Sequence, residues 1–147
     1  MSGPKKPLPT SDLWDQLIKA ASLRQFIGEN GIGLPAFCEY ISGLCAERGE
    51  VPEHVIKRAN LERSYGHSIF RGDRRPSRDT VLQLAFGFEA DVELAQSLLR
   101  HAGHSTLYPK VPRDTVIGYC LNHKTSFIET QQILMDLGLP LIGGRAK

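Results

Sequence analysis

Short segments in which apolar residues have the spacing of a helix, separated by glycine and proline, limit most strongly what this chain can fold into. In one such segment Phe37, Tyr40, Ile41 and Leu44 recur at intervals of one to three residues, and Gly49 follows the segment. This spacing gathers apolar side chains on one helix face, and no stretch of strand length alternates apolar with polar residues. The sequence therefore predicts an all-α fold, with helices at about 11–27, 36–48, 52–59, 62–70, 78–88, 91–102, 112–123 and 126–137.

Part of the chain is an internal repeat with an offset of 35 residues. RDTVLQLAFGFEADVELAQSLLRHAG at 78–103 aligns with RDTVIGYCLNHKTSFIETQQILMDLG at 113–138, and the first four residues are identical. The repeat predicts two stacked helical hairpins, each ended by a glycine. The alternative is a chance similarity between two amphipathic helix pairs. If the hairpins are related, the second carries an apolar face that must cover the first hairpin or pair with another subunit.

The positive charge of the chain is concentrated in one segment. The formal net charge of all 147 residues is +2, whereas residues 57–78 hold seven Lys or Arg and two Asp or Glu, a local net charge of +5. A basic segment in an otherwise nearly neutral chain indicates a polyanionic partner, or else a solvated surface without a partner.

The same segment carries a helix-turn-helix pattern. PEHVIKRA is followed by Asn60, which tolerates a left-handed conformation, by the predicted helix 62–70 and by RGDRRPSRD. With these elements, residues 34–90 resemble the phage-repressor/Cro-like (XRE-type) helix-turn-helix family. We accordingly divide the chain into a flexible arm (1–10), an N-terminal helix and loop (11–33), a helix-turn-helix domain (34–90) and a C-terminal helical extension (91–147).

The resemblance implies that helix 62–70 lies in the major groove of duplex DNA. Arg63 is then the best candidate to bind a guanine edge, because its planar fork of donors matches that edge. Tyr65 can touch DNA or pack against the protein. The implied base contacts are Arg63, Ser64, Tyr65, His67 and Ser68. The implied phosphate contacts are Lys57, Arg58, Arg71, Arg74, Arg75 and Ser77, the last of which also caps the next helix.

Three positions depart from the family pattern. Pro52 stands where the family usually has a phosphate-contacting glutamine, Ile56 where it favours alanine, and Gly66 where it favours a β-branched core residue. In the family the last two positions face each other. We therefore expect Ile56 to fill the space that Gly66 leaves, and Gly66→Val to clash with it.

Together these patterns predict a sequence-specific DNA-binding transcriptional regulator that acts as a homodimer in the cytoplasm. The alternative is a helix-turn-helix scaffold used as a protein–protein adaptor or antitoxin-like partner through its flanking helices. The sequence has no nucleotide-binding glycine loop and no convincing nucleophile–base pair, so we expect no enzyme, no cofactor and no metal site. Its apolar runs are much shorter than the ~20 residues of a membrane span, and three cysteines without a CxxC pair fit a reducing compartment.

Overall fold

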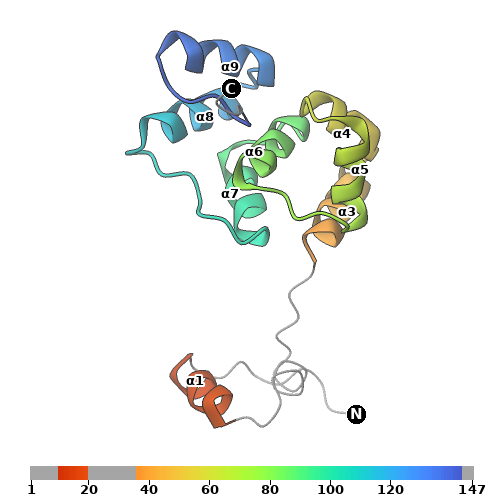
Figure 1. The fold of residues 1–147 in the computed structure, drawn as a ribbon, viewed down its shortest axis with the longest axis vertical. Helices are drawn as coiled ribbons and strands as arrows, with labels where there is room; N and C mark the ends of the chain where they lie inside the picture. Colours follow the sequence, from red (N-terminus) through yellow and green to blue (C-terminus); the bar gives the residue numbers. More distant parts are fainter. Residues whose placement is uncertain (1–9, 20–35, 144–147) are drawn as a thin grey trace. The chain divides into compact units, whose positions relative to one another are not determined.

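The computed structural model describes residues 10–19 and 36–143 (Figure 1). Within these residues the chain forms eight helices and no strand, which confirms the all-α prediction. No described helix is both long and apolar enough to cross a lipid bilayer. The helices are α1 (Thr10–Lys19), α3 (Phe37–Arg48), α4 (Pro52–Arg58), α5 (Arg63–Arg71), α6 (Arg78–Gly87), α7 (Val92–His101), α8 (Pro112–Asn122) and α9 (Phe127–Asp136).

Helix α1 belongs to a separate unit and is described by itself. Of the helix predicted at 11–27, the structure describes the part up to Lys19. Its apolar side chains Trp14 and Ile18 are largely exposed. The remainder of that helix, the arm at 1–9 and the loop that follows lie outside the described residues.

Three helix pairs in the other unit, which begins at Ala36, are joined by the same tight turn. The turn residues Asn60, Glu89 and Lys124 have left-handed conformations, with φ of 58°, 53° and 56°. Two residues after each of them, a side-chain oxygen accepts from the first free amides of the next helix and so caps it. These caps are Glu62, Asp91 and Ser126. The left-handed turn predicted at Asn60 is confirmed, and the α4–α5, α6–α7 and α8–α9 pairs share one construction.

Helix α6 lies at the centre of this unit, with residues 80–87 all buried. Helix α4 packs across it at very short range, because a Cβ at Gly87 would lie 2.3 Å from the Val55 carbonyl oxygen. Arg58 Nε donates to the Gly87 carbonyl at 2.8 Å, and the Gln83 amide donates to the Ala59 carbonyl at 3.0 Å. The close backbone approach at Gly87 and these two hydrogen bonds fix α4, and through it α5, on the centre of the unit.

One apolar core runs through the whole of this unit. It extends from Ile41 on α3 to Ile142 near the end of the described residues, and it includes side chains from each helix between them. The division placed between residues 90 and 91 therefore falls inside one core, at the start of α7.

The repeated segments pack against each other through reciprocal contacts. Arg78 of the first copy pairs with Asp114 of the second at 3.0 Å, and Arg113 of the second copy pairs with Asp79 of the first at 2.9 Å. Arg113 and Asp114 occupy the aligned positions of Arg78 and Asp79, so the two ion pairs are equivalent under the 35-residue offset. The prediction of two stacked, related hairpins is confirmed.

Further contacts recur at the same offset. The side-chain amide of Gln96 donates to the Leu107 carbonyl and accepts from the Leu107 N–H, and Gln131 does the same with Ile142. The two paired arginines also donate to backbone carbonyls of the segments that follow α7 and α9. Each copy is thus a helix pair with an extended return segment. We call residues 78–108 repeat A and residues 113–143 repeat B.

Candidate nucleic-acid interface

The predicted reading helix is α5, which Glu62 begins and Gly72 ends. The Glu62 carboxylate accepts from the amides of Ser64 and Tyr65 at 2.8 and 2.9 Å, and these bonds lower the pKa of Glu62. Gly72 has a left-handed φ of 85°, which glycine adopts without strain. Three residues of α5 are buried, and its first and last arginines are exposed. The buried residues are Gly66, Ile69 and Phe70.

Gly66 faces Ile56 across the contact between α4 and α5, as the sequence predicts. A Cβ at Gly66 would lie 2.5 Å from Ile56 Cγ2, 2.7 Å from Cγ1 and 3.0 Å from Cδ1. Ile56 is 2% exposed, so it has no open space to rotate into. The XRE-type pattern favours the larger side chain at the position of Gly66, on the second helix of the pair. In this protein the larger side chain is Ile56 on the first helix, and it sets how closely α5 approaches the core.

A carboxylate on α4 holds two of the predicted base contacts. Arg63 Nε donates to both oxygens of Glu53, at 2.9 and 3.1 Å, and His67 Nε2 donates to Glu53 Oε1 at 2.8 Å. The bond from His67 and then that from Arg63 lower the pKa of Glu53, and the same carboxylate raises the pKa of Arg63. Both Arg63 and Glu53 stay hydrated, so their ion pair orients the guanidinium but contributes little to stability.

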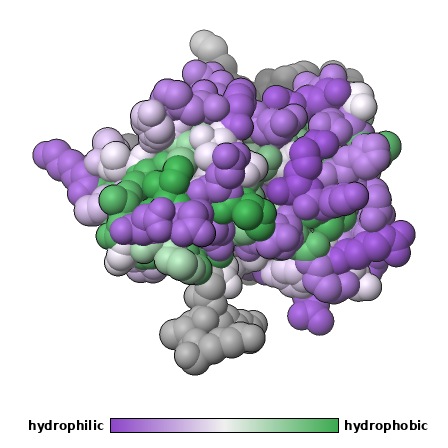
Figure 2. Space-filling view, turned by 90° about the horizontal axis from the view of Figure 1, so that it is seen from above, coloured by the Kyte–Doolittle hydropathy of each residue, from purple (hydrophilic) through white to green (hydrophobic). Residues whose placement is uncertain are grey.

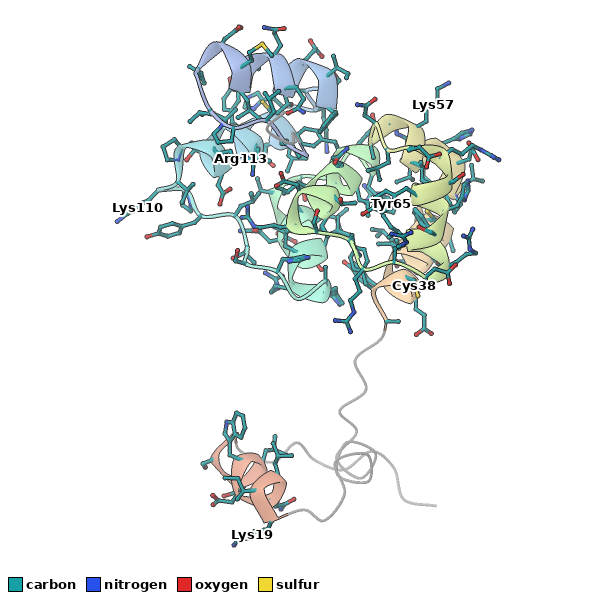
Figure 3. The ribbon with its side chains drawn as sticks, in the orientation of Figure 1. Lys19, Cys38, Lys57, Tyr65, Lys110 and Arg113 are labelled. Carbon is teal, nitrogen blue, oxygen red and sulfur yellow. The ribbon has the colours of Figure 1, made fainter. Side chains whose placement is uncertain are left out.

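The other predicted base contacts lie in different surroundings. Ser64 is exposed beside Arg63. Tyr65 is half-buried, packs against the core and points from α5 back toward the body of the protein (Figure 3). Ser68 is half-buried as well, and its hydroxyl donates to the Tyr65 carbonyl. The structure therefore gathers Arg63, Ser64 and His67 on the outer side of α5, whereas Tyr65 and Ser68 have partners within the protein.

Four of the predicted phosphate contacts lie on the surface around α5. Lys57, Arg74 and Arg75 are exposed, and within the described part of the chain no carboxylate pairs with them. Lys57 points away from the body of the protein (Figure 3). Arg71 is exposed too, and it pairs with Asp73 at 3.0 Å.

The remaining two, Arg58 and Ser77, have structural partners. The Arg58 guanidinium donates to the Gly87 carbonyl and to the Glu50 carboxylate, so it ties α4 to α6. The Ser77 hydroxyl accepts from the Thr80 amide at 3.2 Å and caps α6, as the sequence predicts. We leave Arg58 out of the exposed basic surface for this reason.

The role of Glu53 is the part of this surface that reasoning from sequence missed. A signal for it was present. Ile56 and Gly66 face each other ten residues apart, and Glu53 and Arg63 have the same spacing one helical turn earlier. Two helices that face each other at one turn also face each other at the adjacent turn, so the ion pair follows from the predicted packing.

No protein-family model, curated protein or solved structure matches this chain. In the ranges that the structure describes, no three His, Cys, Asp or Glu side chains come together as metal ligands do. The geometry and charge of the α4–α6 surface are therefore what indicates a function.

Proposed function

We propose that this chain is a sequence-specific DNA-binding transcriptional regulator that reads the major groove with α5. One observation carries the proposal: α5 is fixed on the core by one side, presents a polar side outward, and has exposed cations on both flanks. These cations are Lys57 on α4 and Arg74 and Arg75 after α5. A single helix fits the major groove, which is about 12 Å wide. The resemblance of residues 34–90 to the XRE-type family supports the same function, which belongs in the cytoplasm.

Arg63 is the residue that we expect to discriminate between bases. It lies at the start of α5, and recognition helices of this type contact base edges with their first residues. Its guanidinium offers parallel donors to guanine O6 and N7. In the complex it exchanges the Glu53 carboxylate for the base edge. Because the pair with Glu53 is exposed, the exchange carries little penalty. Ser64 and His67 complete the reading surface beside it.

The flanking cations would supply most of the affinity. Lys57, Arg71, Arg74 and Arg75 are exposed and would neutralise phosphates beside the groove, and Ser77 would extend this row at the start of α6. Contacts of this kind fix the register of a protein on DNA but do not select its sequence. Tyr65 and Ser68, which have partners within the protein, would hold α5 in shape rather than read bases.

The two carboxylates on this surface favour the second candidate, a protein–protein adaptor. Glu53 and Glu62 stand at the start of α4 and α5, among the predicted base contacts, and would oppose a phosphate backbone. A surface of mixed charge suits a protein partner with complementary charges. The excess of cations around α5 favours DNA as the partner, because an adaptor needs that excess only when its partner is acidic.

Selection from random duplexes at about 150 mM salt distinguishes the two candidates. An enriched motif supports the regulator, and weak binding that salt abolishes supports the adaptor. With the motif known, Arg63→Ala is expected to lose discrimination at one or two base pairs, by about 1–3 kcal/mol each. Arg74→Ala combined with Arg75→Ala is expected to weaken binding to all sequences and to flatten the salt dependence.

Arg100→Ala is the matched control, since it removes an exposed arginine from the last turn of α7. It is expected to leave both the motif and the salt dependence unchanged. If Arg63→Ala and the Arg74/Arg75 pair have the same effect on every sequence of the library, the division into base and phosphate contacts is wrong.

A further inference from the structure

The internal repeat lets two faces of the same protein be compared position by position. Repeats A and B bury each other through equivalent contacts. A position that is buried in A but exposed in B is therefore covered in A by residues outside the two repeats. In this unit those residues are the α3–α5 segment, with α4 lying directly on α6.

Eight aligned positions differ in this way, and at four of them repeat B has a strongly polar or charged residue, namely Asn122, His123, Glu129 and Gln132. The other four are the following. Thr80, Leu84 and Leu98 of repeat A are buried and Ala102 is half-buried, whereas each counterpart in repeat B is exposed. Those counterparts are Thr115, Tyr119, Ile133 and Leu137, which we call the uncovered face. Tyr119 is 62% exposed and Leu137 60%. At the place where repeat A holds α3–α5, repeat B thus has a surface of mixed polarity, in which Tyr119, Ile133 and Leu137 are the exposed apolar side chains.

A shallow groove continues this face. It has a volume of about 420 Å³ and is lined mainly by apolar atoms of Pro109, Pro112, Val116, Leu137 and Leu139, with Lys110 at its rim. Seen from above, the protein shows hydrophobic surface among hydrophilic residues (Figure 2). Lys110 points outward from the protein (Figure 3). Contiguous apolar surface of this kind marks an interaction site.

The occupant of this face is not a second α3–α5 segment. In repeat A, the Val55 carbonyl approaches α6 at Gly87, where a Cβ would lie 2.3 Å from it. Repeat B has Asn122 at the aligned position, and Asn122 has a Cβ. Gln83, which bonds to the Ala59 carbonyl of α4, is replaced by Gly118. The close approach at Gly87 and the Gln83 bond are both absent from repeat B, so a partner of this face would have to be a different surface.

We propose that the uncovered face is the homodimer interface of this chain, packed against the same face of a second copy. The four residues that form it are uncharged, whereas Glu129, one turn before Ile133 on α9, adds an exposed carboxylate on the same side of the helix. The flanking charges have opposite signs, from Lys110 at the groove and Asp136 at the end of α9, and can pair across a two-fold axis. The interface lies at the α8–α9 end, away from α5, so both reading helices stay free (Figure 1).

The choice of a second copy as the occupant rests in part on the proposed function, because reading two half-sites requires a dimer. The uncovered face itself is identified from the comparison of the two repeats, without reference to the proposed function. The experiment therefore measures association without DNA first.

Sedimentation equilibrium of the full chain is expected to give a dimer. Tyr119→Glu and Leu137→Glu are each expected to raise the dissociation constant at least about tenfold, because each buries an unpaired carboxylate in the interface. The controls are Ile128→Glu and Met135→Glu, which change equally exposed apolar residues (62% and 59%) outside the face. Their counterparts in repeat A, Glu93 and Arg100, are exposed as well. Both controls are expected to change the dissociation constant less than about twofold.

Amide hydrogen exchange of the unmutated chain at low and high concentration locates the interface even if a variant fails to fold. Protection that rises with concentration in α8 and α9 supports the inference. A chain that is monomeric at every concentration, or a dimer that survives both face variants, overturns it. Selection of a DNA motif by a monomeric chain would refute the interface and leave the proposed function standing. A dimer that forms through this face but selects no DNA motif would support the interface and refute the proposed function.

Discussion

The packing of Gly66 against Ile56 makes a strong prediction about stability. Gly66→Val adds a Cβ and two methyl groups at a crowded position. The Cβ alone would lie 2.5 and 2.7 Å from the two γ-carbons of Ile56. Those atoms are next to the branch point of a side chain that is stiff in a helix and buried, so they cannot swing away. Overpacking of this kind costs about 1–3 kcal/mol, against a few tenths of a kcal/mol gained in helix propensity. We expect a net loss of about 2 kcal/mol, or roughly 8 °C in melting temperature.

Gly43→Val is the matched control, because Gly43 lies inside helix α3 and a Cβ there meets no atom within 4 Å. It is expected to leave the melting temperature unchanged or slightly raised. Ile56→Ala alone is expected to cost about 2–5 kcal/mol, and the double variant with Gly66→Val less than the sum of the two single changes, by about 2 kcal/mol. Urea and thermal melts followed by circular dichroism measure all four. Additive effects, or a Gly66→Val protein as stable as the parent, would refute the compensation.

Three further predictions concern other contacts. Glu53→Gln removes the carboxylate that holds Arg63, and it is expected to raise the affinity for the selected DNA severalfold in fluorescence anisotropy. The control, Glu93→Gln on α7, is expected to leave the affinity unchanged. No gain in affinity for Glu53→Gln would contradict the proposed role of Glu53. Gly87→Ala is expected to lower the free energy of unfolding by about 3 kcal/mol or more in thermal melts, because the Val55 carbonyl cannot rotate away from the new Cβ. The control is Gly118→Ala, whose new Cβ meets nothing closer than 3.3 Å, and it is expected to lower the free energy of unfolding by less than about 1 kcal/mol. Burial would raise the pKa of Asp79, but bonds from Arg113 and the Gly143 amide outweigh it and hold the pKa below its usual value of 3.8. Asp79 therefore stabilises the fold above about pH 4 and loses this effect as the pH falls further. Asp79→Asn is expected to reduce the loss of stability between about pH 5 and pH 2 in thermal melts. An unchanged loss would contradict this role of Asp79.

The helices were predictable from the sequence because their ends are determined locally. Gly49 and Gly72 take left-handed conformations directly after α3 and α5, and Ser77 caps α6 with its own side chain. Each signal acts within a few residues of the helix end, so a single sequence contains it. The facing of Ile56 and Gly66 came from the resemblance to a family instead.

The partners of the arginines were not predictable from charge counts. Arg58 and Arg78 add to the local charge of residues 57–78, yet Arg58 is tied to Glu50 and to the Gly87 carbonyl, and Arg78 to Asp114. The Gly87 and Asp114 partners lie 29 and 36 residues away in sequence. Such pairs depend on how helices stack, which composition does not contain. The basic surface around α5 is consequently smaller than the sequence count suggests, and it is concentrated in Lys57, Arg74 and Arg75.

The repeat does contain the missing information for Arg78. The same arginine recurs as Arg113, outside the basic segment, and both copies pair with the aspartate of the other repeat. The arginine and aspartate kept in both copies serve the contact between the copies, whereas some residues that differ serve what only one copy does. Gln83 and Gly87 differ from Gly118 and Asn122 because only repeat A receives α4. By the same logic, the apolar Tyr119 and Leu137 of repeat B belong to a contact that repeat A does not make.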